Sequence, residues 1–391
     1  MQKVLVLDAN QRSALAVIRS LGRRGIPIIA ADQETRSLGG ASRYAVASVQ
    51  YPDPARSPRG FLDAIAALVR DHGIDIVVPA TDLTTMLLVE QPEYVQQSRL
   101  AAPPAATYET LTDKRRLVEL AGRLGVAAPE TRVARSAAEI EAAAPALGYP
   151  LVLKPARSRY LKAGQVISTA VRIINHPDKL EETVASLGWL RDIPCLVQRF
   201  VPGQGAGIFA LYGESGPLAW FAHKRIREKP PSGGVSVLSE SADVDSRMKD
   251  MAARLLSASH WMGVAMIEYR VTPDGTPYLM EVNGRFWGSL QLAIDSGVDF
   301  PWLLHRLVSG AATEGPANYR RGRRLRWLLG DVDNLILQLR SGETGRGGKA
   351  RAAARFLASF VDLSCRQEVF RWSDPVPGLR EARHWIGALR S

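Results

Sequence analysis

Apolar runs alternate with stretches of helical periodicity along the first quarter of the chain. Residues 4–9 (VLVLDA) and 26–32 (IPIIAAD) have the pattern of strands, and residues 13–25 between them repeat apolar positions at helical spacing up to a glycine. A further apolar run, DIVVPATD, follows at 75–82 after a second helical stretch. Strands that alternate with amphipathic helices are typical of a parallel sheet. We therefore predict a parallel α/β domain over residues 1–107.

The pattern changes at the proline-rich stretch AAPPAAT (101–107), which we interpret as a domain boundary. Beyond it, single helices are separated by apolar strands that end in turn signals. The clearest signal is Asp274-Gly275, which lies between two apolar strands and is typical of a β-hairpin. Residues 108–310 are therefore predicted to form an α+β domain with antiparallel hairpins.

Arginine-rich stretches dominate residues 311–391, which carry more than half of the net charge of +11. Residues 320–341 and 350–362 have helical periodicity, and the low-complexity stretch 341–356 is the most loop-like in the chain. A basic surface can attract nucleic acid, an anionic membrane or an acidic substrate. We favour a solvated basic face on helices that pack against the rest of the protein. We therefore expect a basic, mostly helical C-terminal extension and no nucleic-acid partner.

Composition places the chain among ordinary globular proteins, with 46% hydrophobic and 23% charged residues. Cys195 and Cys365 are far apart in sequence, so neither a disulfide framework nor a zinc site is expected. No apolar run reaches the length of a membrane span, and the run at the start, MQKVLVLDAN, is too short for a signal peptide. We therefore expect a cytoplasmic protein without a transmembrane segment.

Two common nucleotide-binding motifs are missing. The turn after the first strand, DANQRSA, lacks the glycines of G-x-G-x-x-G, although Asp32 ends the second strand where a ribose-binding acid would stand. Gly347-Gly348-Lys349 is similar to the end of a P-loop, but Ala350 follows it and no strand precedes it, so we interpret it as a loop. We therefore predict neither dinucleotide binding in the N-terminal domain nor a P-loop.

The strongest candidate for chemistry is the segment MEVNGRFWGS (280–289). Glu281, Asn283 and Arg285 alternate along a strand, so they share one face. Glu268, in the other strand of the hairpin, can face the same cleft. Carboxylate and amide oxygens suit Mg²⁺, and a guanidinium beside the metal can neutralise an anion. A structural Glu–Arg ion pair and a simple turn at Asn283 are the alternatives, and the second carboxylate favours the metal site.

Three further positions could serve a phosphate or a nucleobase. Lys154 ends the strand LVLK, and Pro155 stops that strand from continuing, so its ammonium group is delivered to a cleft. Lys114 lies on a helix that opens with the cap Thr112. For each lysine alone, a solvated surface position is the alternative. Residues 198–201 (QRFV) precede Pro-Gly, where exposed backbone groups can read the edge of an adenine ring.

In this order the motifs resemble the ATP-grasp superfamily over roughly residues 1–310, and they are most similar to its carboxylate–amine ligases of the carbamoyl-phosphate-synthase and biotin-carboxylase kind. The matching segments are the Lys114 helix, VLKP, QRFVPG, HKRIRE, MIEY and MEVNGR. The resemblance implies that a pre-ATP-grasp domain (1–107) precedes an ATP-grasp domain (108–310) and the helical extension. The ATP-grasp domain would divide into a small lid subdomain at about 127–200 and a large subdomain at about 201–310.

The resemblance also implies an ADP-forming ligase that uses ATP and Mg²⁺, or Mn²⁺, to activate a carboxylate as an acyl phosphate for attack by an amine. It assigns the phosphates to Lys114 and Lys154, the adenine pocket to Gln198, Arg199, Phe200 and Val201, and the metal to Glu268, Glu281 and Asn283. It assigns the reacting groups to Arg285 and to Arg225 or Lys224. The loop ARSRYLKAGQ (156–165) would cover ATP, although it is basic where the family has glycine and serine.

Three functions remain open from the sequence. The first is this ligase, which would act on a small-molecule carboxylate and a small-molecule amine and could form a homodimer. The second is an ATP-binding sensor or assembly protein without ligase turnover. The third is a nucleic-acid binder that uses the basic extension, which would show steep salt dependence and little need for Glu281. The retained acids and Arg285 favour the ligase.

Overall fold

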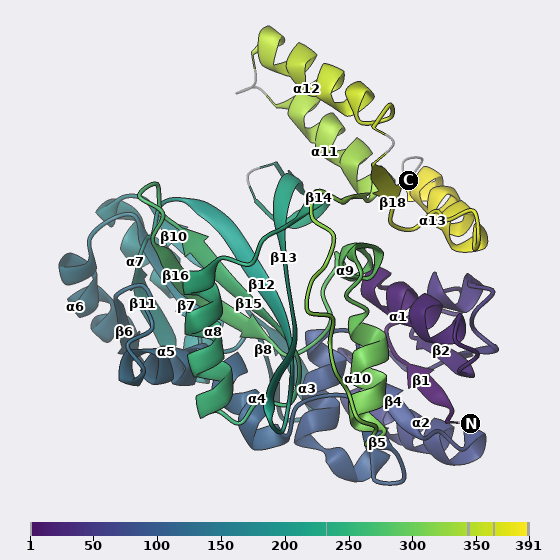
Figure 1. The fold of residues 1–391 in the computed structure, drawn as a ribbon. Helices are drawn as coiled ribbons and strands as arrows, with labels where there is room; N and C mark the ends of the chain where they lie inside the picture. Colours follow the sequence, from purple (N-terminus) through teal and green to yellow (C-terminus); the bar gives the residue numbers. More distant parts are fainter. Residues whose placement is uncertain (1, 232, 342–344, 363, 389–391) are drawn as a thin grey trace.

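The computed structural model describes residues 2–231, 233–341, 345–362 and 364–388. Its N-terminal part is a five-stranded parallel sheet in the order β3-β2-β1-β4-β5, which confirms the predicted α/β domain (Figure 1). The strands are β1 (Val4–Val6), β2 (Ile28–Asp32), β3 (Ala47–Gln50), β4 (Ile76–Val78) and β5 (Arg99–Leu100). The helices are α1 (Arg12–Gly22), α2 (Pro58–His72) and α3 (Asp82–Glu90).

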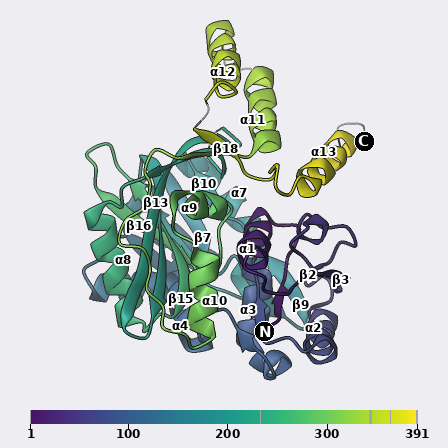
Figure 2. The ribbon, with the colours of Figure 1, turned by 45° about the vertical axis from the view of Figure 1, so that its right-hand side comes forward.

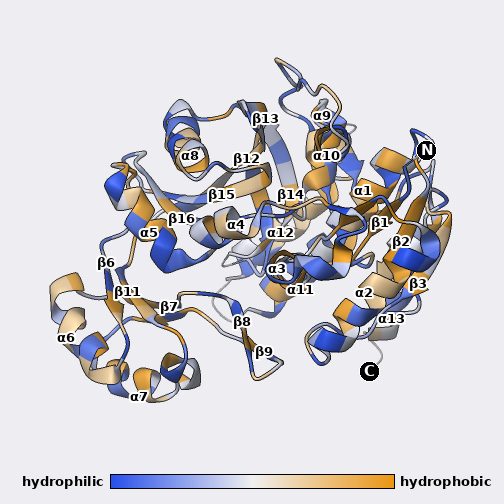
Figure 3. Cartoon of the chain, turned by 90° about the horizontal axis from the view of Figure 1, so that it is seen from below, coloured by the Kyte–Doolittle hydropathy of each residue, from blue (hydrophilic) through white to orange (hydrophobic). Residues whose placement is uncertain are grey.

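Helices cover both faces of this sheet. Side chains of α1 pack in the same apolar cluster as Val4 and Val6, whereas those of α2 and α3 pack with Leu5 and Leu7. Strands buried on both faces read as continuous apolar runs, which explains why β1 is hydrophobic throughout and β2 is hydrophobic up to its last residue, Asp32 (Figure 3).

The turn between β1 and α1 is closed by polar side chains. The carboxylate of Asp8 accepts hydrogen bonds from the backbone N–H of Ala80 at 2.9 Å and from the hydroxyl of Thr84 at 2.6 Å. The Asp32 carboxylate accepts from the backbone N–H of Asn10 at 2.7 Å. Asp32 therefore holds the turn itself, which is a structural use of the residue that resembled a ribose-binding acid.

Two short helices link the N-terminal domain to the next part of the chain, α4 (Ala105–Thr112) and α5 (Lys114–Arg123). The predicted cap Thr112 is wrong, because Thr112 ends α4 and its hydroxyl donates to the carbonyl of Tyr108. The cap of α5 is Asp113, whose carboxylate accepts from the backbone N–H groups of Arg115 and Arg116 at 3.0 and 3.1 Å.

A small antiparallel sheet follows, in the order β10-β7-β11-β6. Its strands are β6 (Thr131–Ala134), β7 (Leu151–Pro155), β10 (Arg172–Ile174) and β11 (Cys195–Arg199), and its helices are α6 (Ala137–Leu147) and α7 (Leu180–Ala185). The predicted covering loop at 156–165 contains part of a separate two-stranded ribbon of β8 (Arg159–Lys162) and β9 (Gln165–Ser168).

The central element is a seven-stranded sheet in the order β16-β15-β12-β13-β14-β17-β18 (Figure 1). Its first five strands in the chain are β12 (Gln204–Gly213), β13 (Gly216–Lys229), β14 (Val235–Ala242), β15 (Gly263–Val271) and β16 (Pro277–Asn283). The helices of this region are α8 (Ser246–Ala258), α9 (Leu290–Ser296) and α10 (Phe300–Val308). The segment between β11 and β12 therefore connects two different sheets.

The C-terminal extension is mostly helical but adds the last two strands of the central sheet. It contains β17 (Arg324–Arg326), α11 (Leu328–Arg340), α12 (Arg346–Ala358), β18 (Cys365–Gln367) and α13 (Val376–Ala388). Gly347, Gly348 and Lys349, predicted to be a loop, lie in the first turns of α12. In both ribbon views α11 and α12 extend away from the body, and α13 lies near α1 (Figure 2). Within the described residues no helix is long and apolar enough to cross a membrane.

Candidate functional site

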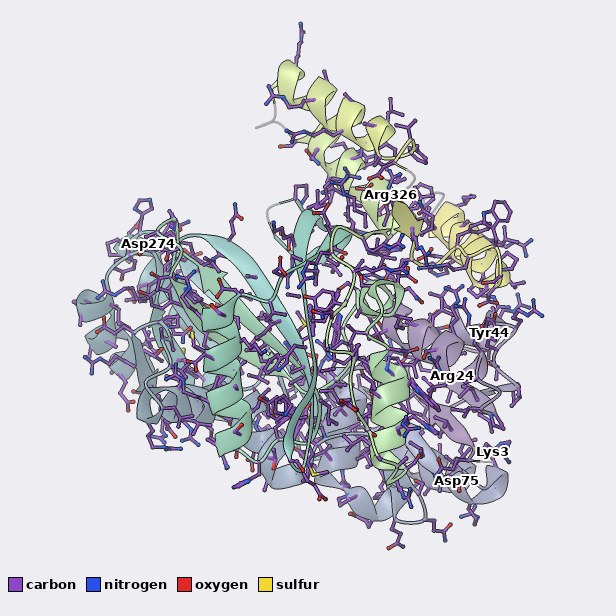
Figure 4. All side chains as sticks on the ribbon, in the orientation of Figure 1. Lys3, Arg24, Tyr44, Asp75, Asp274 and Arg326 are labelled. Carbon is purple, nitrogen blue, oxygen red and sulfur yellow. The ribbon has the colours of Figure 1, made fainter. Side chains whose placement is uncertain are left out.

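Glu268 and Glu281 face each other across the predicted β-hairpin. The two residues are direct partners in the antiparallel pairing of β15 and β16, whose turn carries Asp274 at the tip (Figure 4). Asn283 lies two residues beyond Glu281 on the same face, and its amide donates to Glu268 Oε1 at 3.3 Å. The hairpin therefore brings together all three predicted metal ligands.

A β-bulge directs the side chains of β16. Tyr269 pairs with Leu279 and Glu268 pairs with Glu281, so Met280 is an extra residue with no partner on β15. The extra residue allows Leu279 to remain in the core, at 2% exposure, while Glu281 reaches the opposite face. A bulge that re-aims a side chain beside a site is a recurring device in sheets.

Lys114 and Lys154 approach this pair from two other elements. Lys114, the first residue of α5, places its Nζ 3.4 Å from Glu281 Oε2 and donates to Ser158 Oγ at 3.1 Å. Lys154, on β7, has its Nζ 3.9 Å from the sulfur of Met280. Burial lowers the pKa of Lys154, and nearby Glu281 opposes that shift. An ammonium group held in this way lacks a full counter-charge, which suits the binding of phosphate.

The two acids have opposite shifts. Burial raises the pKa of Glu268, and the charge of Glu281 raises it further. Burial also acts to raise the pKa of Glu281, but the charges of Lys114 and Lys154 outweigh it and lower the pKa below its usual value. A divalent cation between the two carboxylates would favour the ionised form of both.

The donor set fits Mg²⁺ as a partly hydrated ion. The described residues contain no group of three or more His, Cys, Asp or Glu side chains placed to hold a metal. Glu268 and Glu281 provide two carboxylates and Asn283 an amide oxygen, all of them hard ligands. Mg²⁺ commonly takes one or two carboxylates and completes its shell with water and substrate phosphates.

Arg285 lies beyond the end of β16 and is held by a residue that the sequence analysis missed. Its Nε and Nη2 atoms donate to the two carboxylate oxygens of Asp82 at 3.0 and 3.1 Å. Nη1 donates to the carbonyl of Phe286 at 3.0 Å, and Nη2 also lies 3.4 Å from Asn283 Oδ1. Asp82 begins α3 just after β4, at the edge of a parallel sheet where ligands usually bind, and this position was the available signal.

Of the two residues predicted on β13, the structure brings only Arg225 to the site. Its guanidinium donates to Glu268 Oε2 and to Glu228 Oε1, each at 3.2 Å. Lys224 is exposed, lies on the opposite face of the strand and pairs in register with Glu240. The sequence left the choice between these neighbours open, and strand alternation decides it.

The predicted adenine-binding residues lie where β11 leaves the small sheet. Gln198 is buried and donates to Thr131 Oγ1 at 2.9 Å, while Arg199 forms an exposed ion pair with Glu130 at 2.8 Å. The guanidinium of Arg270 stands 5.8 Å from the Phe200 ring centroid and donates to the carbonyl of Val201 at 3.2 Å. Gln198 and Arg199 end β11, and Phe200 and Val201 begin the connection from the small sheet to the central sheet.

A cavity of about 500 Å³ opens between the hairpin and the N-terminal domain. The residues that line it include Asp82, Tyr108, Glu109, Lys114, Arg157, Ser158, Glu281, Asn283 and Arg285. Arg157, from the predicted covering loop, donates to Glu90 at 3.0 Å and to Glu109 at 2.6 Å. The loop is thereby attached to α3 and α4, which form the far wall of the cavity.

The two facing acids and the two lysines thus meet beside a cavity, where the hairpin, the small sheet and the N-terminal domain come together. A protein-family model described as "ATP-grasp in the biosynthetic pathway with Ter operon" matches residues 193–330, which contain Arg225, Glu268, Glu281 and Arg285. The chain belongs to the ATP-grasp superfamily, as its sequence motifs predicted.

Relatives and solved structures agree with this assignment. The chain is 27% identical over 149 residues to the N5-carboxyaminoimidazole ribonucleotide synthase of Pseudomonas aeruginosa, an alignment that covers 37% of this chain and 38% of the synthase. It is 27% identical over 364 residues to the uncharacterized protein y4rH of Sinorhizobium fredii, covering 86% and 70% of the two chains. A biotin carboxylase complex from Campylobacter jejuni has the same fold, with a TM-score of 0.66, 18% identity and coverage of 83% and 74%.

Proposed function

We propose that the protein is an ADP-forming ligase that uses ATP and Mg²⁺ to activate a carboxylate as an acyl phosphate, which an amine then attacks to give an amide or peptide bond. The observation that carries the proposal is the direct pairing of Glu268 with Glu281, with Lys114 in contact and the cavity alongside. The similarity of the chain to a ribonucleotide synthase and to a biotin carboxylase supports the proposal.

Each residue of the cluster has a role in this proposal. Glu268, Glu281 and Asn283 would hold Mg²⁺, which when bound neutralises the phosphate charges during phosphoryl transfer. Lys114 and Lys154 bind the phosphates of ATP, and the backbone at residues 198–201 binds adenine. Arg225 keeps the Glu268 carboxylate oriented and charged, through the contact at 3.2 Å.

The cavity provides the place for the reacting groups. Arg285 faces it with one N–H of Nη1 not used by Asp82 or Phe286, so that it can donate to the oxygen on which charge develops. The loop that carries Arg157 and Ser158 lies over Lys114 and lines the same space. A covered site excludes water, which an acyl phosphate requires in order to survive until the amine attacks.

The test is phosphate release from Mg–ATP across a panel of small carboxylates and amines, each alone and in pairs. A ligase releases phosphate only when both partners are present, and Glu281→Gln abolishes the release. Glu141→Gln, an exposed position on α6, is the matched control and keeps full activity. Binding of Mg–ATP without release for any pair would instead favour the sensor or assembly protein. Equal release from the Glu281→Gln variant would contradict the assignment of the site.

A further inference from the structure

A second cavity lies between the hairpin of β13 and β14 in the central sheet and the helices α11 and α12. Its volume is about 660 Å³, and none of its lining residues lines the first cavity. Part of its wall is apolar, contributed by Ile226, Leu238, Leu335, Ala352, Phe356 and Ala358. The helices α11 and α12 belong to the C-terminal extension, so residues 108–310 alone do not form this cavity.

The wall of this cavity contains more guanidinium groups than carboxylates. It is lined by Arg227, Arg324, Arg351 and Arg355, against Glu228, Asp331 and Asp362. The carboxylate of Asp331 is fully buried and accepts hydrogen bonds from both Arg227 and Arg326, at 2.6 Å each. The positive charge around the cavity therefore exceeds what its acids neutralise.

Arg326 adds to this excess from behind the cavity wall. It is fully buried at the base of α11, near the point labelled in Figure 4. Its guanidinium carbon lies 4.5 Å from the ring centroid of Phe356 and 4.2 Å from that of Phe360. Neither of its Nη atoms has a hydrogen-bond partner among the described residues. Aromatic faces stabilise this cation but do not remove its charge.

Arg351 and Arg355 are the two cations that face the cavity without a partner. They lie four residues apart on α12, so they project from the same side of the helix. Within the described chain the side chain of neither arginine makes an ion pair or a hydrogen bond, and α12 contains no acidic residue. Two like charges at this spacing repel each other, and an anion bound between them would remove that repulsion.

We propose that this cavity binds an organic anion, a carboxylate or phosphate group attached to an apolar body. Arg351 and Arg355 bind the charged group, and the apolar wall formed by Leu335, Ala352 and Phe356 packs against the body. The site lies outside the proposed ligase centre and depends on residues that take no part in it.

A chain of contacts connects this cavity to Glu268, one of the proposed metal ligands. Glu228 lines the cavity, and its carboxylate accepts from Arg225 at 3.2 Å. Arg225 in turn donates to Glu268. The backbone carbonyl of Glu228 accepts from the Asn334 amide, at 2.5 Å, and Asn334 lies on α11 and also lines the cavity. We expect occupation of the cavity to act on Glu268 through Glu228 and Arg225, and so to change the affinity of the protein for Mg–ADP.

Calorimetry with phenyl phosphate and benzoate on the full chain tests the binding. We expect both probes to bind, inorganic phosphate to bind at least fivefold more weakly than phenyl phosphate, and R351Q/R355Q to weaken phenyl phosphate at least tenfold. R346Q, an exposed arginine of α12 that does not line the cavity, is the matched control and binds like the wild type. Repeating the titration in K154M excludes binding at the proposed nucleotide site, because the affinity for phenyl phosphate stays unchanged there.

The proposal fails if neither organic probe binds, if R351Q/R355Q binds as R346Q does, if inorganic phosphate binds as tightly as phenyl phosphate, or if K154M abolishes binding. For the connection, saturating phenyl phosphate should change the Kd for Mg–ADP at least threefold in the wild type and leave it unchanged in E228Q. An unchanged Kd in the wild type, or the same change in E228Q, overturns the connection. Absence of Mg–ADP binding would contradict the proposed function instead, since probe binding is measured without nucleotide.

Discussion

Asp82 holds Arg285 through both oxygens of its carboxylate, at 3.0 and 3.1 Å, although the two residues are 203 positions apart in the chain. The N-terminal domain therefore orients an arginine that follows the hairpin of Glu268 and Glu281. Asp82 is half-exposed, so this pair contributes little to stability. Its importance lies in the direction in which the guanidinium points.

The first prediction concerns this orientation. Asp82→Asn should reduce the rate of ligation about tenfold or more, because small displacements of a positioned group are costly in catalysis. The melting temperature should change little. Initial rates and thermal unfolding provide the two measurements. Asp63→Asn, which breaks an exposed ion pair with Arg59 on α2, is the matched control and keeps the rate. An Asp82→Asn enzyme with the wild-type rate would show that Arg285 needs no support.

The second prediction concerns Lys154, whose pKa is lowered by burial. Lys154→Met should weaken Mg–ADP binding about tenfold or more, because a charge-assisted contact to phosphate is lost. The free energy of unfolding without nucleotide should stay equal or increase, since a partly buried ammonium is replaced by an apolar group beside Met280. Calorimetry and urea unfolding check the two effects. Lys179→Met, on the exposed surface of the small subdomain, should leave both unchanged.

The third prediction is a pH dependence of stability that comes from His223. Burial lowers the pKa of His223 to about 3 from an ordinary value of 6.5. Below pH 6.5 the imidazole of His223 is therefore protonated in the unfolded chain but stays neutral in the folded protein until the pH approaches 3. The stability that depends on a neutral imidazole is complete above pH 6.5 and is lost as the pH falls, by about 1.4 kcal/mol per pH unit.

Urea unfolding at pH 7 and pH 5 measures this contribution. In His223→Gln the loss of stability between the two pH values should be about 2 kcal/mol smaller than in the wild type. His176→Gln, an exposed histidine, should show the wild-type loss. If both variants lose stability as the wild type does, His223 is protonated in the folded protein at pH 5.

The fourth prediction concerns Asp331, which neutralises Arg227 and Arg326 together. Asp331→Asn should destabilise the protein by about 3–5 kcal/mol, because it leaves buried guanidinium groups without a counter-charge. Glu119→Gln, which removes an exposed ion pair with Arg115, should cost less than about 1 kcal/mol. Thermal or urea unfolding of both variants gives the comparison, and equal losses would be evidence against a charged cluster at Asp331.

The hairpin was predictable because its information is local. Asp274-Gly275 sets the turn, and period-two alternation then places Glu268 and Glu281 within reach of each other. The bulge at Met280 was not predictable, because it reflects the fit of Leu279 into the core rather than any turn residue. The order of the ATP-grasp motifs along the chain was likewise sufficient to predict the fold.

Contacts between distant parts of the chain could not be predicted from the sequence. The pairing of Asp82 with Arg285 depends on how the N-terminal domain packs against the hairpin, and the hydrophobic pattern of the sequence contains no information about that packing. The cap of α5 was placed one residue too early, because Thr112 and Asp113 are both good caps and only the end of α4 separates them. Strands β17 and β18 were missed, because each is only three residues long within an arginine-rich segment.

The ion pair between Arg19 and Asp374 has a consequence for how the protein folds during its synthesis. Arg19 is fully buried in α1, and its guanidinium donates to the Asp374 carboxylate at 2.9 Å and to the carbonyls of Glu368 and Val369. A ribosome adds Asp374 355 residues after Arg19. The N-terminal domain of a nascent chain therefore carries an uncompensated cation on α1 until Asp374 has been synthesised, and α1 reaches its final packing only after that point.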